Sequence, residues 1–553
     1  MQRQESLTAV QYLLWNAIEH SKAGELAEAE RQCLQILAID VRHEEALNLL
    51  GAVLHETGRP EAATKMIRRA IAVNGKKAVY HCGLGHVLED LSQHEEAIAT
   101  YKQALALQAN YAEANFGLGN VYRKQGKLEE AVAEYERALQ LDPDNVLFHN
   151  NLGATFYAQD KFEAAKAEYG RALALKADDE LALNNLGVVF YSEDKLDEAL
   201  NCYERAIAIK PDYAGAHWNQ SLAQLRQGDF AAGWRNYEWR CSRENAPRSF
   251  PFPLWRGEPL KGARILLHSE QGLGDTLQFL RYLPLIQAMD CSVVLEVQEP
   301  LQRIAAQLPG LAALVHGGDD LPPLDWQCPM MSVPLAFETT LETIPAQVPY
   351  ITVPEEAREA AAVRDWPDEG LRVGLVWAGN PSHIDDRRRS IPLSFLEPLF
   401  GVEGAHFFSL QMGPSVAQLA DTEAQITDLT PAISDMADTA ALIEQLDLVI
   451  CVDTAVAHLA GALARPAWVL LPFAPDWRWL REREDSPWYP TLRLFRQPKL
   501  RDWTSVVEKV RDELVKEADQ VSMKSQKESV SSAPSSLSMR RAARSTSSMR
   551  PWR

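Results

Sequence analysis

Small and apolar residues recur every 34 positions through the first two hundred residues of the chain. In five successive periods a glycine follows a leucine, and alanines return twelve and nineteen positions after that glycine. Small residues at fixed spacing are needed where paired helices approach closely, so the pattern predicts two packed helices per period. The positions that set this register are Gly51, Gly85, Gly119, Gly153, Gly187, Ala63, Ala97, Ala131, Ala165, Ala199, Ala70, Ala104, Ala138, Ala172 and Ala206.

The period resembles that of the tetratricopeptide repeat. Extending the register places a first repeat near Ala17 and a degenerate last one near Ser221, so we expect about seven repeats over residues 7–244. Stacked helix pairs form an all-α superhelix whose concave surface usually holds a peptide or a partner protein. A rigid spacer or a dimerisation module is the alternative.

From about residue 245 the pattern changes to short apolar runs that alternate with helical stretches. Such runs are typical of parallel strands buried on both faces by helices. Two series, separated by a proline-rich connection near residues 345–370, predict two α/β lobes of Rossmann-like type over residues 245–365 and 366–515. The expected strands are residues 263–270, 291–298, 311–317, 372–379, 406–412, 446–453 and 466–472, and one helix is expected over residues 275–289.

Composition changes where the pattern changes. Only Pro60 and Pro143 of the 31 prolines, and only Trp15 of the 14 tryptophans, precede residue 211. The stretch 516–553 is rich in Ser, Lys and Arg and poor in apolar residues. A segment of this kind cannot bury enough apolar surface to fold, so we expect a disordered tail.

Charge and cysteine usage limit the partners of the chain. The formal net charge of −20 argues against a general affinity for nucleic acid or anionic membranes, because phosphate binding rests on dense Lys and Arg. Seven scattered cysteines show neither zinc-ligand spacing nor a disulfide framework, which indicates a reducing compartment. The start of the sequence predicts no secretion signal, and charged residues and a proline interrupt the most apolar later window. We expect a cytoplasmic protein without an integral membrane segment.

Three stretches fall at the carboxyl ends of expected strands, where ligands gather in open parallel sheets. The first is EQGLGD, residues 270–275. Gly272 and Gly274 permit a tight turn close to a ligand, and Asp275 would lie at the start of the next helix. An aspartate at this position either faces a ligand or simply caps the helix.

The second stretch is VDTAVAHLAGALARP, residues 452–466. Asp453 and Thr454 follow a strand and precede a helix whose free N–H groups and dipole would suit a diphosphate. His458 lies one turn further along and would add a hydrogen-bond donor. The alternatives are capping by Asp453 or Thr454 alone, and an ordinary partly buried histidine.

The third stretch is WAGNPSHIDDRRRSIPL, residues 377–393. A turn of small residues that includes Gly379 and Asn380 precedes a run of three arginines that ends at Arg389. Guanidinium groups suit phosphate oxygens by their charge and their bidentate geometry. A solvated basic loop is the alternative.

Residues from about 263 to 512 resemble the heptosyltransferase-type glycosyltransferases of family 9. The motifs that carry the resemblance are GLGD after a strand and DTAVAHL before a helix, spaced as the family spaces them. With the repeats, GWRNYEWR (233–240) and APDWRWL (474–480), the order of motifs resembles bacterial tetratricopeptide proteins with a glycosyltransferase-like C-terminal region. The resemblance implies a GT-B fold, with the acceptor mainly on the first lobe and the nucleotide-sugar donor mainly on the second.

The same resemblance implies roles for individual residues. Asp275 aligns with the proposed base of the family. The residues that it assigns to donor binding are Arg389, Asp453, Thr454, Ala455 and His458. Ala455 stands where the family usually has glycine, and Arg389 replaces the commoner lysine.

The implied reaction is inverting transfer of a hexosyl or heptosyl group, with no metal or other cofactor. Asp275 would take a proton from an acceptor hydroxyl as that hydroxyl attacks the anomeric carbon. Arg389 and the helix that begins near Asp453 would stabilise the departing nucleoside diphosphate. No D-x-D follows an expected strand in this half of the chain, which fits charge stabilisation without a cation.

We therefore expect a glycosyltransferase whose repeats present a protein acceptor to a GT-B active site. The alternative is a tetratricopeptide scaffold or adaptor whose GT-B-like half holds a nucleotide without turnover. A dinucleotide-dependent oxidoreductase is disfavoured, because no G-x-G-x-x-G follows a strand with an acidic residue about twenty positions further on.

Overall fold

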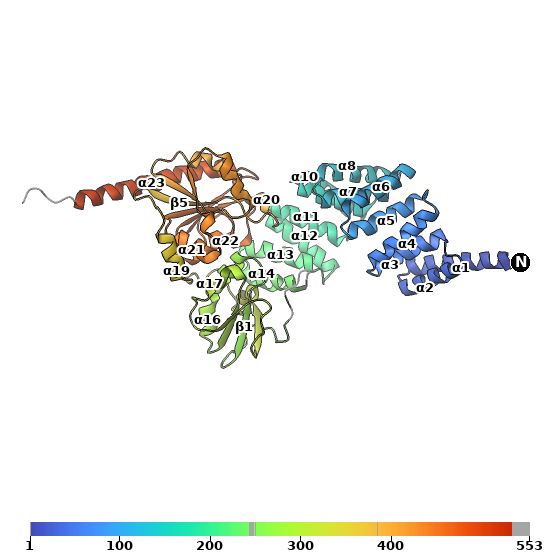
Figure 1. Cartoon of the computed structure of the whole chain (residues 1–553), viewed down its shortest axis with the longest axis horizontal. Coiled ribbons are helices and arrows are strands. Elements are labelled where there is room, and N and C mark those ends of the chain that lie inside the picture. The colour runs from blue at the N-terminus through green and yellow to red at the C-terminus, as the bar shows by residue number, and fades with distance from the viewer. Residues whose placement is uncertain (1, 243–247, 249, 384, 533–553) are drawn as a thin grey trace, which may run out of the picture. The chain divides into compact units, whose positions relative to one another are not determined.

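A computed structural model of the chain describes residues 2–242, 248, 250–383 and 385–532. The chain forms two compact units, and Figure 1 labels some of their elements. The first unit comprises Met1–Tyr191 and Asp197–Ala216, and the second comprises Ser192–Leu196 and His217–Arg553.

The first unit is a series of helix pairs joined by short turns. Consecutive helices pack against each other, both within a pair and between pairs, from α1 as far as α10. This arrangement confirms the all-α repeat organisation that the 34-residue period predicts. The helices are α1 (Gln2–Lys22), α2 (Leu26–Ile39), α3 (Glu44–Glu56), α4 (Pro60–Val73), α5 (Ala78–Asp90), α6 (His94–Leu107), α7 (Ala112–Lys124), α8 (Leu128–Leu141), α9 (Val146–Ala158), α10 (Phe162–Leu175), α11 (Glu180–Ser192) and α12 (Leu196–Ile209).

The recurring glycines let the two helices of a pair touch. A Cβ atom at Gly153 of α9 would lie 2.8 Å from Cε1 of Tyr169 on α10, and that tyrosine is buried. A methyl group therefore does not fit at this position. The same contact recurs between Gly85 and Tyr101, Gly119 and Tyr135, and Gly187 and Tyr203.

Gly153→Ala should destabilise the first unit, because the buried ring of Tyr169 leaves no space for the added methyl group. Overpacking of this kind costs about 1–3 kcal/mol. Gly170, on the outer part of α10, is the matched control, since a Cβ atom there meets no atom within 4 Å. Gly170→Ala should instead stabilise its helix by about 0.5–1 kcal/mol. Urea unfolding followed by far-UV circular dichroism measures both variants, and equal effects would contradict this packing.

The second unit contains two parallel sheets, which confirms the predicted pair of α/β lobes. The N-terminal sheet has the strand order β3-β2-β1-β4, and the C-terminal sheet has the order β10-β9-β8-β5-β6-β7. All neighbouring strands pair in parallel. The strands are β1 (Arg264–His268), β2 (Ser292–Glu296), β3 (Leu311–Val315), β4 (Trp326–Pro329), β5 (Leu371–Val376), β6 (Ala405–Ser409), β7 (Ile426–Asp428), β8 (Leu448–Val452), β9 (Ala467–Leu471) and β10 (Leu492–Arg496).

Helices pack against these sheets. The helices of the second unit and its boundary are α13 (Ala214–Gln227), α14 (Phe230–Tyr237), α15 (Leu273–Phe279), α16 (Leu283–Gln287), α17 (Gln302–Ala305), α18 (Val333–Ala336), α19 (Glu355–Ala362), α20 (Asp386–Arg389), α21 (Met436–Glu444), α22 (Ala455–Ala462) and α23 (Trp503–Ser532). Eight short 3-10 helices of the described residues complete the list: η1 (Glu238–Ser242), η2 (Leu280–Tyr282), η3 (Glu299–Leu301), η4 (Met330–Ser332), η5 (Leu393–Leu399), η6 (Pro414–Asp421), η7 (Thr430–Ala432) and η8 (Trp477–Trp479).

The C-terminal sheet is buried on both faces. Alternate residues of β8 point to opposite sides, so Val449 and Cys451 join one hydrophobic cluster, whereas Ile450 and Val452 join another. The first cluster includes residues of α22, and the second includes residues of α23. Burial on both faces explains why these strands appear in the sequence as continuous apolar runs.

Some elements differ from the sequence predictions. Strands β4 and β7 have only four and three residues, too few for an apolar run to stand out, and the arginines of β10 (LRLFR) obscure its apolar pattern. The helix expected over residues 275–289 is divided into α15, η2 and α16, because Pro284 at the start of α16 has no N–H to continue the helix.

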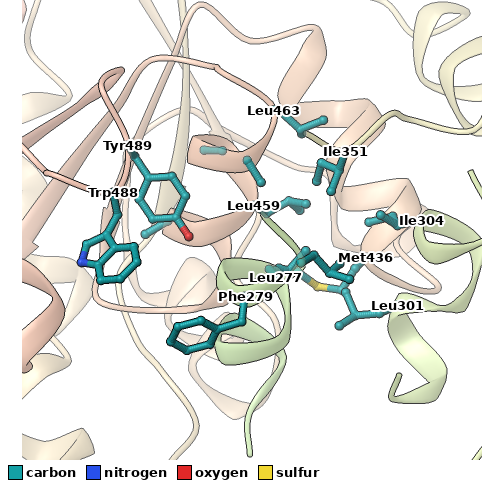
Figure 2. Close-up of a cluster of buried hydrophobic side chains, with 14 of the residues drawn as sticks. Leu277, Phe279, Leu301, Ile304, Ile351, Met436, Leu459, Leu463, Trp488 and Tyr489 are labelled. Carbon is teal, nitrogen blue, oxygen red and sulfur yellow. The ribbon is translucent and has the colours of Figure 1, made fainter. Parts of the chain in front are cut away.

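The two lobes of the second unit share a hydrophobic core, part of which is shown in Figure 2. Leu277 and Phe279 of α15, in the N-terminal lobe, belong to the same cluster as Leu459 of α22, in the C-terminal lobe. The cluster also contains the buried rings of Trp488 and Tyr489. Helix α15 packs directly against α22, so the lobes are held together by apolar burial.

Helix α14 also belongs to this core, although the repeat register extends to residue 244. Phe230, Trp234 and Tyr237 are buried in the cluster that contains α15 and α22. The ring centroid of Trp234 lies 5.2 Å from that of Trp477. The boundary between the compact units therefore falls between residues 216 and 217.

Helix α23 runs into the stretch that composition predicts as disordered from residue 516. Its buried residues include Val506, Val510, Leu514 and Ala518. Their four-residue spacing places one apolar stripe of the helix against the C-terminal sheet, and the overall polar composition hides that stripe. Residues 533–553, the remainder of the predicted tail, lie outside the described residues. Among the described helices, α23 included, none is long and apolar enough to cross a membrane.

Candidate active site

The segment from β8 to α22 places Asp453 and Thr454 at the carboxyl edge of the C-terminal sheet. Asp453 is buried, and Thr454 is the N-cap residue of α22, with an extended backbone (φ −142°, ψ 172°). The side chain of Thr454 accepts no hydrogen bond from the helix, and its buried Oγ1 has no partner among the described residues. The side chain of Thr454 therefore does not cap α22.

Asp275 is the third residue of α15, and both of its carboxylate oxygens are engaged. Oδ2 accepts a hydrogen bond from the backbone N–H of Gly272 at 2.8 Å, which is the helix-capping alternative. Oδ1 accepts a hydrogen bond from Nη2 of Arg478, and the two side chains form an ion pair. One oxygen thus supports the start of α15, and the other contacts the C-terminal lobe.

Gly274 brings the start of α15 against the start of α22. A Cβ atom at Gly274 would lie 2.8 Å from Cδ2 of His458 and 3.4 Å from Cα of Ala455. Only glycine allows so close an approach of the two helices. The GLGD and DTAVAHL motifs, about 180 positions apart in the sequence, are therefore in direct contact.

His458 is a neutral side chain in this contact. Burial lowers its pKa well below the usual range, and the nearby guanidinium groups of Arg478, Arg281 and Arg389 lower it further. Its Nδ1 lies 3.0 Å from the hydroxyl of Tyr489. His458 can therefore donate or accept a hydrogen bond, but it contributes no positive charge at neutral pH.

Arg389 lies at the end of α20 and is packed against Gly379. A Cβ atom at Gly379 would lie 2.7 Å from Nη2 of Arg389, so a larger residue would displace the guanidinium group. Nε of Arg389 lies 3.4 Å from Oδ1 of Asp386. Asn380 serves its own loop instead: its side chain is exposed and accepts a hydrogen bond from the backbone N–H of Ser382 at 3.0 Å.

The pKa of Asp453 is affected by charged residues from several of these segments. Its pKa is raised to about 6, first by burial and then by the nearby carboxylate of Asp476. The indole of Trp479 and the guanidinium groups of Arg389 and Arg478 oppose this rise. Asp453 is therefore within electrostatic reach of both arginines, one of which is bound to Asp275. In the part of the chain that the structure describes, no three His, Cys, Asp or Glu side chains are arranged to hold a metal ion.

Arg478 is the central residue of this arrangement, and no role was predicted for it. Its Nε donates to Oε1 of Gln278 at 2.6 Å, its Nη1 donates to Oδ1 of Asp476 at 2.9 Å, and its Nη2 donates to Asp275. Burial acts to lower the pKa of Arg478, but the carboxylates of Asp476 and Asp275 together raise it above its usual value. The motif APDWRWL contains Arg478, and was the available signal in the sequence.

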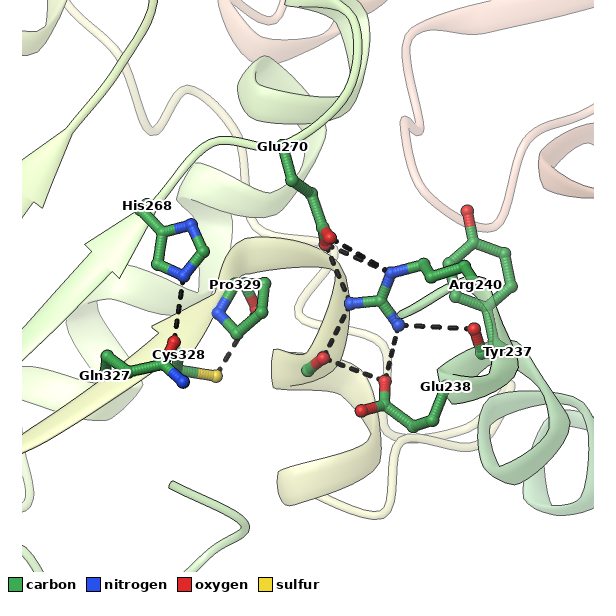
Figure 3. A network of polar contacts seen from close by, with 9 residues as sticks. Tyr237, Glu238, Arg240, His268, Glu270, Gln327, Cys328 and Pro329 are labelled. Carbon is green, nitrogen blue, oxygen red and sulfur yellow. Dashed lines mark hydrogen bonds and ion pairs between the residues drawn. The ribbon is translucent and has the colours of Figure 1, made fainter. Parts of the chain in front are cut away.

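A second buried arginine supports the loop between β1 and α15 (Figure 3). Arg240 donates to the carboxylate of Glu270 from Nε at 3.2 Å and from Nη2 at 2.8 Å. It also contacts Glu238 and the hydroxyl of Ser332, at 2.6 Å and 2.7 Å. Burial raises the pKa of Glu270 although Arg240 opposes that rise. These contacts hold the loop that leads to Gly272 and Asp275.

Asp453→Asn should stabilise the protein at neutral and alkaline pH. The folded state holds the proton of Asp453 up to about pH 6, whereas the unfolded chain releases it near about pH 4. The wild type therefore loses stability as the pH rises from about 4 through about 6, and the loss approaches ~3 kcal/mol at pH 8. The variant has no such proton, so its advantage should disappear as the pH falls to about 4. Urea unfolding between pH 4 and 8 measures this, and a pH-independent difference would contradict it.

Models of known families match both parts of the chain. The first is described as "TPR repeat", and the second as "Glycosyltransferase family 9 (heptosyltransferase)". The repeat model matches residues 85–126, 119–160, 155–194 and 189–228, and the glycosyltransferase model matches residues 414–470. The second match contains the segment from Asp453 to His458, but it includes neither Asp275 nor Arg389.

Individual relatives are more distant. Protein FlbA of Caulobacter vibrioides is 27% identical over 313 residues, which cover 51% of this chain and 52% of FlbA. The chain thus spans about half the length of this relative. Two solved structures that match part of the chain are TTC0263, a thermophilic TPR protein of Thermus thermophilus, and MamA. TTC0263 has 24% identity over 33% of this chain and 99% of its own, with a TM-score of 0.30; MamA has 22% identity over 29% and 94%, with a TM-score of 0.27.

The fold is that of stacked helix pairs followed by two parallel-sheet lobes, which are consistent with a GT-B arrangement. The chain carries tetratricopeptide repeats in its N-terminal part and a glycosyltransferase family 9 domain in its C-terminal part, and FlbA is a distant homologue.

Proposed function

We propose that the protein transfers a hexosyl or heptosyl group from a nucleotide-sugar donor to an acceptor, with inversion and without a metal ion. The family 9 domain suggests glycosyltransferase activity. The observation that carries the finer proposal is that the charges of Arg389 and Arg478 both act on Asp453, while Arg478 also binds Asp275. Arg478 binds Asp275 of the first lobe and lies within electrostatic reach of Asp453 at the start of α22, as does Arg389.

Each group has a defined task in this reaction. The Asp275 carboxylate accepts the proton of the acceptor hydroxyl while the hydroxyl oxygen attacks the anomeric carbon. The bond from that carbon to the diphosphate breaks, and its electron pair leaves with the nucleoside diphosphate. Arg389 and the N–H groups at the start of α22, near Thr454 and Ala455, stabilise the negative charge of that product.

The repeats supply the acceptor in this proposal. The first unit has a groove of about 630 Å³ between α8, α9 and α10. Leu152 and Phe156 line it together with the charged side chains of Glu136 and Arg171. A surface with apolar and charged positions suits a peptide segment of a protein acceptor.

A binding scaffold without turnover remains the second candidate, and a specific observation favours it. Both oxygens of Asp275 are engaged, one with Gly272 and the other with Arg478. An oxygen that is already bound to a guanidinium group is less available to accept the proton of an acceptor hydroxyl. In this case the second unit would hold a nucleotide, and the repeats would recruit a partner.

A panel of UDP-, ADP-, GDP- and TDP-sugars discriminates between the two functions. For the transferase we expect one donor to raise the melting temperature and to be hydrolysed slowly by the wild type. Asp275→Asn should keep donor binding and lower transfer by about 10²-fold or more, because the general base is lost. Asp365→Asn, which changes an exposed aspartate, is the control and should leave both unchanged. Binding without turnover by the wild type on any acceptor would instead support the scaffold.

A further inference from the structure

Arg478 connects the two lobes through hydrogen bonds to residues of both. It is buried, and its guanidinium group donates to Asp275 and Gln278 in the N-terminal lobe and to Asp476 in its own loop. The plane of the guanidinium group lies over the ring of Trp477, with 4.3 Å from Cζ to the ring centroid. Arg478 is thus held in place by its neighbours while its nitrogen donors face groups on both sides of the lobe contact.

The pairing of Arg478 with Asp275 conflicts with the role of Asp275 as a base. The second oxygen of Asp275 already accepts the N–H of Gly272 at 2.8 Å. Each oxygen keeps a further lone pair, but Oδ1 is more available to an acceptor hydroxyl once it leaves Arg478. If Asp275 leaves, Arg478 keeps Asp476 and Gln278, but its buried Nη2 loses its acceptor, which is costly. A second anion is the natural replacement for Asp275.

Two buried hydrogen-bond donors, one on Gln278 beside Arg478 and one on Thr454 next to Asp453, indicate what that anion is. Gln278 is fully buried, and its amide accepts from Arg478 through Oε1, whereas Nε2 of the same amide has no partner among the described residues. The buried hydroxyl of Thr454, next to Asp453, has none either within that part of the chain. Phosphate oxygens only accept hydrogen bonds, and they match both of these donors and a guanidinium group.

We propose that the diphosphate of the nucleotide-sugar donor competes with Asp275 for Arg478. Donor binding transfers the Nη2 contact of Arg478 from Asp275 to a phosphate oxygen, and the released carboxylate then becomes the base. Asp275 is thus held inactive until the donor is bound. This inference rests on the nucleotide-sugar site of the proposed function, and it adds Arg478 as a donor-contacting residue.

Competition of this kind predicts the direction in which the Kd of a nucleoside diphosphate changes. Breaking the pair of Arg478 with Asp275 opposes binding, so removal of the carboxylate must tighten the binding of a nucleoside diphosphate. For Asp275→Asn we expect about a 5- to 30-fold lower Kd, the range of an ordinary coupling between sites. A gain in affinity cannot result from misfolding, which makes this variant a sharp test.

Simple charge repulsion between Asp275 and the phosphates would also make Asp275→Asn bind the nucleotide more tightly. A second substitution separates the two causes. Arg478→Gln should raise Kd about tenfold or more, because a charged hydrogen bond to phosphate is lost. In the Arg478→Gln background, Asp275→Asn should change Kd by less than about threefold if Arg478 mediates the effect. Repulsion alone would leave the gain from Asp275→Asn undiminished in that background.

The experiment measures the Kd of UDP, ADP, GDP and TDP by isothermal titration calorimetry on the full-length protein. The samples are the wild type, Asp275→Asn, Arg478→Gln and the double variant. Arg483→Gln is the charge-matched control, since Arg483 is bound to Asp485 and is more exposed; its Kd should equal that of the wild type. Near-UV circular dichroism verifies that the aromatic core is intact, and Arg478→Lys replaces Arg478→Gln if that variant does not fold.

The outcomes are distinct. A gain in Asp275→Asn that disappears in the double variant supports the competition. Three results overturn it. The Kd is not lower in Asp275→Asn, or it is lower also without Arg478, or none of the four nucleotides binds to the wild type and to Asp275→Asn. Sugar transfer is not needed for this result: the expected coupling without transfer would reject the transferase and keep the competition for Arg478. Transfer without coupling would do the reverse.

Discussion

The organisation of the second unit depends on the direct contact between α15 and α22. Each of these helices begins after a strand, one in each sheet, so their contact sets the distance between the loops of the two lobes. The absence of a side chain at Gly274 permits an approach in which a Cβ atom would lie 2.8 Å from His458. Leu277 and Leu459 belong to the apolar cluster beneath it. The apolar burial that stabilises the fold thus also positions the polar groups above it.

The charge of the site comes from arginines and carboxylates that lie close together. His458 is neutral, and the pKa of Asp453 is raised to about 6 because burial and Asp476 act in the same direction. Arg478 stays charged because two carboxylates outweigh its burial. Such a balanced group of charges is costly to disturb, and any anionic ligand has to replace contacts that already exist. Selectivity for the ligand therefore depends on exchange of partners as much as on the positive charge itself.

The sequence predicted the fold to a large extent because both patterns have a direct physical origin. The 34-residue period follows from close helix contacts such as that of Gly153 with Tyr169, and the apolar runs follow from strands buried on two faces. Short or charged strands such as β7 and β10 have no such signal. The stripe of α23 was missed because four buried positions are hidden in a polar composition.

The candidate site was predicted only in part. The sequence placed Asp275 and the start of α22 at strand ends, and the structure brings them to one contact; their catalytic roles remain predictions. Asn380 was expected beside the substrate; its side chain accepts a hydrogen bond within its own loop, and its role stays a prediction. Arg478 had no predicted role, because its meaning depends on a partner 203 positions away in the sequence, and an arginine between two tryptophans has no local pattern that indicates such a partner.

The burial of α14 in the core of the second unit has a consequence for how such chains arise. Phe230, Trp234 and Tyr237 follow the repeat register in the sequence, yet they pack with residues that belong to the transferase-like fold. A gene exchange that joined a new repeat array at residue 244 would remove aromatic side chains that the α/β part needs for its own stability. An exchange that keeps this core intact has to break the chain before Phe230, so that α14 stays with the α/β part.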